Sequence, residues 1–179
     1  MSPSLSVCVF CGSRPGNRPS YMEAARQTGE MIARRGWRLV YGAGDVGLMG
    51  EVARGAADGD TLGVIPQHLM IREQGRRAVS QFIVTDNMHV RKTVMYMNSD
   101  RIVVLPGGAG SLDEFFEVLT WRQIGLHDKP IYLLNTDGYW EPLMQLLKHS
   151  VSEGFADASL LDFVTVVADV ATLEEELAR

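Results

Sequence analysis

The fold is decided by one stretch of sequence, Arg101-Ile102-Val103-Val104-Leu105-Pro106-Gly107-Gly108-Ala109-Gly110-Ser111-Leu112-Asp113-Glu114. After Arg101, the residues Ile102–Leu105 form a short apolar run, which is typical of a strand buried in a sheet. The residues after the glycines are rich in apolar positions, and we expect a helix to begin at Ser111. A buried strand that enters a helix through a glycine-rich turn is the repeating unit of an α/β protein with a parallel sheet.

The same alternation of apolar runs and amphipathic stretches extends along the chain in both directions. We expect strands at Leu5–Phe10, Trp37–Tyr41, Thr61–Ile65, Gln81–Thr85, Arg101–Leu105, Pro130–Leu134 and Phe163–Val167. We expect helices at Ser20–Arg35, Leu48–Asp58, Asn87–Asn98, Leu112–Gly125 and Tyr139–Glu153, and a short C-terminal helix from Val170. Residues 67–78 fit a loop with a short helix. No repeat or linker interrupts the pattern, so we predict a single domain over residues 1–179.

The composition is that of an ordinary globular protein. Apolar residues make up 46% of the chain and charged residues 22%, which argues against disordered and fibrous architectures. The formal net charge of −5 disfavours nucleic acid and anionic lipid as partners, whereas a small nucleotide needs only a local cluster of donors. No apolar stretch approaches the ~20 residues of a membrane span, and the N-terminus has no basic region. We therefore expect a cytoplasmic protein with no membrane partner.

Three of the expected strands run into glycine-rich or small-residue turns. These turns are Cys11–Gly16, Gly42–Gly47 and Pro106–Ser111. In a parallel sheet the carboxyl ends of the strands meet at one edge, where open α/β folds bind their ligands. The sequence therefore predicts a ligand site at this edge.

The third turn has the features of a phosphate site. Glycines lack Cβ atoms, so the backbone N–H groups of Gly107–Ser111 can close around an anion at the amino end of a helix. The alternative is a tight turn with no ligand. Glu114 follows Ser111 by three residues, so it either completes a capping box or presents its carboxylate to the sugar of a bound nucleotide. Asp113 lies about 100° around the helix from Glu114, and we expect no carboxylate pair there.

A basic motif opens the helix before the phosphate-loop strand. Helical spacing places Met88, Arg91 and Met95 on one face. Arg91 and Lys92 are either a solvated surface pair or, if they face the same crevice, a bidentate phosphate ligand and a point charge. Met88, Met95 and Met97 fit an adaptable apolar base pocket, or else ordinary core or interface packing.

We interpret two other motifs as structural. Gly42, Gly44 and Gly47 satisfy G-x-G-x-x-G, but the motif follows the second strand and no acid ends the next one, so NAD is not expected. Cys8 and Cys11 form a C-x-x-C at a buried strand, where small apolar cysteines are common. The histidines lack the spacing of zinc ligands. We expect neither a cofactor nor a metal.

Five motifs follow one another along the chain, namely Val9–Ser13, Tyr41–Gly44, Gly47–Gly50, Met88–Lys92 and Pro106–Glu114. In this order they closely resemble the Lonely Guy (LOG) family of cytokinin riboside 5′-monophosphate phosphoribohydrolases, and the resemblance runs over residues 5–167. It implies a Rossmann-like, doubly wound, mainly parallel sheet flanked by helices, and a homodimer. The implied reaction is hydrolysis of the N-glycosidic bond of a cytokinin riboside 5′-monophosphate, and of AMP, to the free base and D-ribose 5-phosphate.

The resemblance also assigns the site. Arg91 and Glu114 match the family's functional arginine and glutamate and are the implied catalytic residues. Ala43 departs from a usual glycine, and Ser111 replaces a threonine but keeps its hydroxyl. Substrate-contacting positions of the family match Glu73, Arg91, Lys92, Gly107, Gly108, Ala109, Gly110, Ser111, Leu112, Asp113, Glu114 and Thr120.

Two other functions stay open, a general nucleoside 5′-monophosphate phosphoribohydrolase and a non-catalytic nucleotide sensor or carrier. A fixed carboxylate at Glu114 can stabilise positive charge on the sugar, hold its hydroxyls or orient water. Arg91 cannot serve as a general acid because guanidinium keeps its proton, so we assign it to electrostatics. Candidates for protonating the departing base are Asp45, Glu73 and Glu117. Lysine decarboxylation is not expected, because no lysine has a recognisable pyridoxal-binding context.

Overall fold

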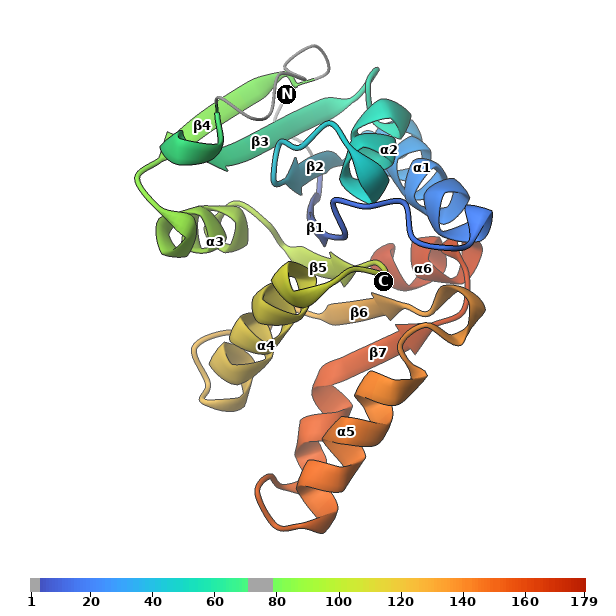
Figure 1. Ribbon diagram of the computed structural model, residues 1–179, viewed down its shortest axis with the longest axis vertical. Helices are drawn as coiled ribbons and strands as arrows, with labels where there is room; N and C mark the ends of the chain where they lie inside the picture. The colour runs from blue at the N-terminus through green and yellow to red at the C-terminus, as the bar shows by residue number, and fades with distance from the viewer. Residues whose placement is uncertain (1–3, 71–78) are drawn as a thin grey trace.

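The computed structural model describes residues 4–70 and 79–179 (Figure 1). Within them, seven strands form one sheet in the order β4-β3-β2-β1-β5-β6-β7, and each neighbouring pair is parallel. The chain therefore starts in the middle of the sheet and builds outward to both sides. The strands are β1 Ser6–Phe10, β2 Arg38–Tyr41, β3 Asp60–Pro66, β4 Gln81–Thr85, β5 Arg101–Val104, β6 Ile131–Leu134 and β7 Val164–Val167.

Helices cover both faces of the sheet (Figure 1). Three pack on one face, namely α1 Pro19–Arg34, α2 Gly47–Gly55 and α6 Val170–Leu177. Three belong to the other face, namely α3 Met88–Met97, α4 Ala109–Gln123 and α5 Glu141–Ser152. Short 3-10 turns follow at η1 Gln67–Leu69, η3 Thr136–Gly138 and η4 Ala158–Phe163. No helix in the described part of the chain is long and apolar enough to cross a membrane.

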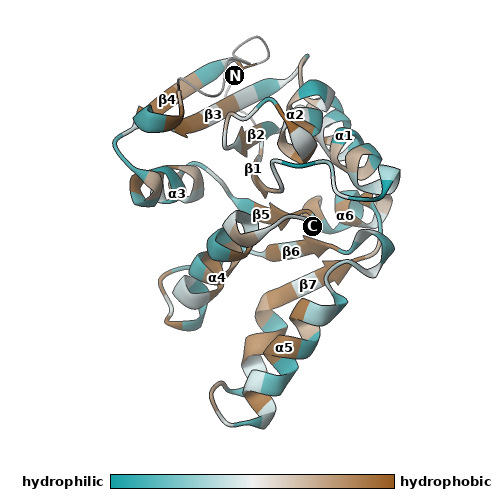
Figure 2. Cartoon of the chain, viewed as in Figure 1, coloured by the Kyte–Doolittle hydropathy of each residue, from teal (hydrophilic) through white to brown (hydrophobic). Residues whose placement is uncertain are grey.

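Two hydrophobic cores lie on opposite sides of the sheet, because successive side chains of a strand point to opposite faces. In β1, Val7 and Val9 enter the core under α1 and α2, whereas Cys8 and Phe10 enter the core under α4 and α5. The strands are accordingly apolar over most of their length, with polar residues at ends of β3 and β4, while the helices alternate between polar and apolar surfaces (Figure 2). This is the doubly wound, Rossmann-like architecture that was predicted.

The strand order reverses between β1 and β5, which are hydrogen-bonded neighbours in register from Val7 opposite Arg101 to Phe10 opposite Val104. The chain leaves β1 for a helix on one face and leaves β5 for a helix on the other. A crevice therefore opens between the two strand ends, as open α/β sheets require at such a switch point. The turns after β1 and β5 are two of the three that the sequence singled out.

The predicted strands are confirmed to within about one residue at each end, but one helix start was wrong, and α2, expected to reach Asp58, ends at Gly55. We expected α4 to begin at Ser111, but it begins at Ala109 with Gly108 as its N-cap. Glycine is itself an acceptable N-cap, so the helix starts inside the glycine run. Ser111 is thus the third helical residue, and the capping-box interpretation of Glu114 was wrong. Of residues 67–78, a 3-10 turn forms at Gln67–Leu69, and residues 71–78 lie outside the described part.

Candidate functional site: a phosphate-type loop at the switch point

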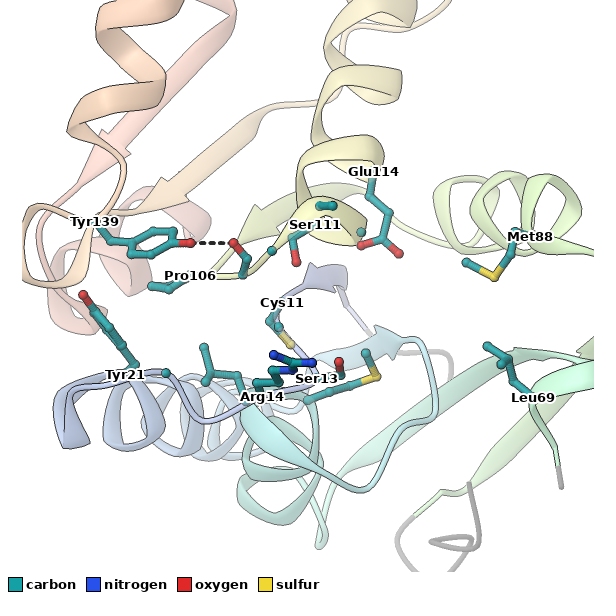
Figure 3. A pocket seen from close by; sticks show the side chains of 18 of the residues that line it. Cys11, Ser13, Arg14, Tyr21, Leu69, Met88, Pro106, Ser111, Glu114 and Tyr139 are labelled. Carbon is teal, nitrogen blue, oxygen red and sulfur yellow. Dashed lines mark hydrogen bonds between the residues drawn. The ribbon is translucent and has the colours of Figure 1, made fainter. Parts of the chain in front are cut away.

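A cavity of about 600 Å³ opens at the carboxyl edge of the sheet, between the turn after β1 and the turn after β5 (Figure 3). Most of the predicted site residues lie here. The lining includes Arg91, Gly107–Ser111 and Glu114. In Figure 3, Ser13 and Arg14 rise from one wall, while Ser111 and Glu114 point inward from the opposite wall.

The carbonyl groups of the loop that begins α4 are used in hydrogen bonds within the protein. Three successive carbonyls accept hydrogen bonds from the protein: Pro106 from Gly12 N–H at 3.0 Å, Gly107 from Tyr139 O–H at 2.5 Å, and Gly108 from Leu112 N–H at 3.1 Å. The first N–H groups of α4 have no partner within the helix, as at every helix start. Donors without matching acceptors, at the positive end of a helix dipole, make this loop suited to an anion.

The buried guanidinium of Arg91 is held by main-chain oxygens. Its Nε donates to the Val64 carbonyl at 3.0 Å and its Nη2 to the Gly42 carbonyl at 2.8 Å, while Nη1 lies 3.7 Å from Met88 Sδ. A Cβ atom on Gly42 would lie only 1.7 Å from Nη2, so glycine is required there for Arg91 to fit. Arg91 is only 5% exposed, and the solvated-pair interpretation of Arg91 and Lys92 was wrong.

Lys92 lies behind the cavity rather than on its lining. Its side chain is 7% exposed, and its Nζ lies 2.9 Å from Asp113 and 2.5 Å from Glu117, both on α4. Burial opposes the charge, but the hydrogen bonds to Glu117 and Asp113 outweigh it and raise the pKa of Lys92 above its ordinary value. Lys92 thus links α3 to α4, and its ammonium group is not available to bind a phosphate.

Glu114 is the carboxyl group that faces the cavity. Among the described residues no hydrogen-bond donor pairs with it, although it lies one turn inside α4 and is half-buried. Burial raises the pKa of Glu114 to about 7; the charge of Arg91 works against this rise and that of Asp113 adds to it. A carboxyl group that changes its charge near neutral pH and has no protein partner is typical of a chemically active residue.

The remaining predicted residues do not line the cavity. Leu112 is half-buried, Asp113 pairs with Lys92, and Thr120 is exposed about two turns farther along α4. Glu73 lies outside the described residues. Of the three methionines proposed for a base pocket, Met88 lines the cavity, whereas Met95 is buried in the core and Met97 is 71% exposed.

The sequence reasoning left several lining residues unassigned, chiefly Cys11–Arg14, Tyr21, Leu48, Met49, Leu69 and Tyr139. The turn after β1 was placed at the correct edge, but nothing in its residue types identified Arg14. Tyr139 could not be found from spacing, because it reaches the loop across the fold. Cys8 and Cys11 are free and buried, and burial raises the pKa of both thiols, which agrees with a packing role.

The chain matches a known family of proteins. A family model described as "Possible lysine decarboxylase" matches residues 49–177. The chain is 43% identical over 175 residues to "Probable cytokinin riboside 5′-monophosphate phosphoribohydrolase LOGL1" of Oryza sativa subsp. japonica, covering 97% of this chain and 77% of that protein. The chain belongs to the LOG family. Another relative, "Cytokinin riboside 5′-monophosphate phosphoribohydrolase LOG3" of Arabidopsis thaliana, is 40% identical over 173 residues, or 96% of this LOG-family chain and 80% of the relative.

Solved structures with the same fold include molybdenum cofactor carriers. The carrier protein of Chlamydomonas reinhardtii is 25% identical, with a TM-score of 0.74 and coverage of 97% of this chain and 96% of that chain. The molybdenum cofactor binding protein of Rippkaea orientalis is 26% identical, with a TM-score of 0.75 and coverage of 99% and 98%. The LOG fold is therefore shared with proteins named for binding rather than catalysis, and the function has to be argued from the site.

Proposed function

We propose that this LOG-family chain hydrolyses the N-glycosidic bond of cytokinin riboside 5′-monophosphates, and of AMP, to release the free base and D-ribose 5-phosphate. The observation that carries the proposal is the position of Glu114. Its carboxyl group has no donor partner among the described residues, and it projects into the cavity one turn beyond the anion-binding start of α4. The loop and the carboxylate line the same cavity side by side, an arrangement that suits a ligand in which a phosphate is joined to a sugar.

The phosphate loop supplies binding and orientation. A 5′-phosphate at Gly107–Ser111 meets backbone N–H groups and the positive end of the α4 dipole. The ribose then lies beside Glu114. Fixing the sugar in this way removes much of the entropic cost of bringing the bond to the carboxylate.

Glu114 acts in its ionised form. Cleavage of an N-glycosidic bond builds positive charge on the sugar, which a fixed carboxylate in a low-dielectric site stabilises. The same group orients water or holds the ribose hydroxyls. The Arg91 charge favours ionisation of Glu114 against the effect of burial. Of the suggested proton donors, neither Asp45 nor Glu117 lines the cavity, and Glu117 is paired with Lys92.

The base lies at the end of the cavity beyond Glu114. Figure 3 places Pro106 and Tyr139 on one side of Glu114 and Met88 and Leu69 on the other. With the phosphate at the loop and the sugar at Glu114, the base extends towards the apolar pair. Methionine is flexible and polarisable, so this end suits an adenine that carries an apolar prenyl group.

Lysine decarboxylation, which the description of the family model suggests, has no support in the site. The chain has three lysines, Lys92, Lys129 and Lys148, and none is on the described lining of the cavity. The Nζ of Lys129 lies 3.9 Å from the centre of the Tyr96 ring and donates to the Tyr96 carbonyl at 2.7 Å. A pyridoxal enzyme needs a lysine that reaches the cofactor.

The proposal includes a homodimer. Apolar side chains stand exposed on α3 and after α4, namely Val90, Met97, Ile124 and Leu126. Lys92 links these two helices, so the two groups belong to neighbouring elements. Light scattering on the wild type and on Met97→Glu tests the assignment. We expect a dimer that the charge weakens, and a monomeric wild type would contradict it.

Release of free base tests the activity itself. Wild type, Glu114→Gln and the control Glu153→Gln, whose exposed carboxyl lies at the end of α5, are incubated with isopentenyl-AMP and with AMP. We expect release by the wild type and control, and a loss of roughly 10²–10³-fold in Glu114→Gln. The ratio of the two substrates distinguishes cytokinin activation from general salvage. Binding of both nucleotides without any release would contradict the hydrolase and favour a carrier.

A further inference from the structure

A phosphate dianion next to a carboxylate calls for a nearby cation with free donors. Arg91 is the obvious choice, but two of its donor nitrogens are already bonded to the Val64 and Gly42 carbonyls. These two bonds fix the guanidinium and leave it Nη1, which lies 3.7 Å from Met88 Sδ, and one hydrogen of Nη2 for a ligand. Lys92 is bonded to two carboxylates outside the cavity. Lys92 is therefore not available to a phosphate, and Arg91 offers only the donors that its two carbonyl bonds leave.

Arg14 is differently placed. It lines the cavity, and it forms no hydrogen bond or ion pair with any residue in 4–70 or 79–179. Other exposed arginines of the described chain are paired, for example Arg34 with Glu174 and Arg54 with Glu51. Within the described lining of the cavity, Arg14 is thus the cation that has all its donors available.

The backbone of Arg14 is anchored close to the phosphate loop. Two residues before it, Gly12 donates its N–H to the Pro106 carbonyl at 3.0 Å and accepts from Met49 N–H at 3.2 Å. These bonds hold the turn after β1 between the phosphate loop and α2. Two residues span at most ~7 Å, so the side chain of Arg14 starts beside the loop and projects from the facing wall (Figure 3).

We propose that Arg14 binds the 5′-phosphate of the substrate from the wall opposite the start of α4. This inference rests on the proposed function, because it takes the ligand to be a nucleoside 5′-monophosphate. The backbone N–H groups of Gly108–Gly110 supply one side of the phosphate site and the guanidinium supplies the other. Arginine is suited to this contact, since its planar fork forms two parallel hydrogen bonds to phosphate oxygens.

The contact has a recognisable kinetic consequence. The phosphate does not change its charge while the N-glycosidic bond breaks, so Arg14 stabilises the bound substrate and the transition state to a similar degree. Loss of such uniform binding raises KM and leaves kcat unchanged. It also reduces the preference for the nucleotide over the matching nucleoside, because a nucleoside offers Arg14 no anion.

Three variants test the inference: Arg14→Ala, Arg14→Lys and the control Arg34→Ala. The side chain of Arg34 is 61% exposed, and its loss leaves Glu174 paired with Arg35. AMP turnover gives KM and kcat, and calorimetric titration with inorganic phosphate gives the anion affinity without any need for turnover. We expect Arg14→Ala to raise KM and weaken phosphate binding by about 10- to 100-fold, with kcat within about twofold of the wild type. Arg14→Lys should recover part of the affinity, and the control should match the wild type.

The outcomes separate this inference from the proposed function. If the wild type releases base and Arg14→Ala changes neither KM nor phosphate affinity, or lowers kcat alone, the inference fails and the hydrolase stands. If the wild type releases no base but Arg14→Ala still weakens phosphate binding, the hydrolase fails and the phosphate contact of Arg14 stands. Unchanged melting temperatures of the variants confirm that each effect is local.

Discussion

Replacement of Glu114 by Gln tests the physical basis of the site. Burial raises the pKa of the Glu114 carboxyl to about 7, although the charge of Arg91 opposes the rise. Glutamine has nearly the same shape but takes up no proton, so the variant removes one titration and little else. Both the stability and the activity should therefore lose a dependence on pH that the wild type has.

The magnitude follows from the difference between the ordinary pKa of 4.5 and the folded-state value of about 7. Because the folded chain binds this proton more tightly than the unfolded chain, the stability from Glu114 is fully present below pH 4.5 and is lost as the pH rises through 7. At 1.36 kcal/mol per pKa unit, the whole loss is about 3.4 kcal/mol. About 2.5 kcal/mol of it falls between about pH 5 and pH 8.

Urea unfolding at fixed protein concentration measures this difference. Across that range, we expect the free energy of unfolding of the wild type to fall by about 2.5 kcal/mol relative to Glu114→Gln. In parallel, kcat/KM for base release by the wild type should rise with pH through about 7 as the carboxylate forms. If the free energies of unfolding of the two proteins change with pH in parallel, the raised pKa of Glu114 is refuted. A flat rate profile would refute the ionised carboxylate as the active form.

Three further substitutions probe the support of the site. Lys92→Met leaves the Glu117 carboxylate without its cation and should cost about 2 kcal/mol in urea unfolding, of which Glu117→Gln in the same chain should restore a part; a neutral effect would contradict the pairing. Gly107→Ala places a Cβ atom 2.0 Å from Ser111 Oγ, so it should destabilise the fold by about 1–3 kcal/mol and weaken phosphate binding in calorimetry. An unchanged phosphate affinity would show that the loop accommodates the methyl group without losing its shape. Tyr139→Phe removes the hydroxyl that donates to the Gly107 carbonyl and should cost about 1 kcal/mol in unfolding and raise KM for AMP severalfold; an unchanged KM would leave the hydroxyl a purely structural role.

The fold was largely predictable because its inner strands are buried on both faces. Such strands are continuous apolar runs, and Ile102–Leu105, which follows the charged residues Asp100 and Arg101, is one of them. The start of α4 was missed because we took Ser111 as the capping residue, whereas the N-cap of this helix is Gly108. The strand order was not predicted either, since spacing along the chain does not say on which side of β1 the later strands pair.

The candidate site was predictable where its functional residues are close together in the sequence. Gly107–Ser111 and Glu114 belong to one strand, loop and helix start, so their proximity follows from the local sequence alone. Arg14 and Tyr139 come from distant turns, and only the folded sheet brings them to the same cavity. Ala43, which replaces a usual family glycine, keeps a positive φ of 59°. The turn after β2 thus retains the backbone shape of glycine at some conformational cost.

From the sequence we treated Arg91 and Lys92 as a pair, but in the structure these two adjacent cations of α3 have different roles. Lys92 is neutralised by Asp113 and Glu117, so its contribution is to fix α3 against α4, the helices that carry Arg91 and Glu114. Arg91 is held by main-chain carbonyls instead of by an acid, so its positive charge is not cancelled by its partners. That uncancelled charge lies next to a buried carboxyl group and favours its ionised form. A carboxylate partner for Arg91 would have cancelled its charge and removed this effect. The bonds of Arg91 to the Val64 and Gly42 carbonyls, and the glycine at position 42 that makes room for them, therefore serve the chemistry of Glu114 as well as the packing of Arg91.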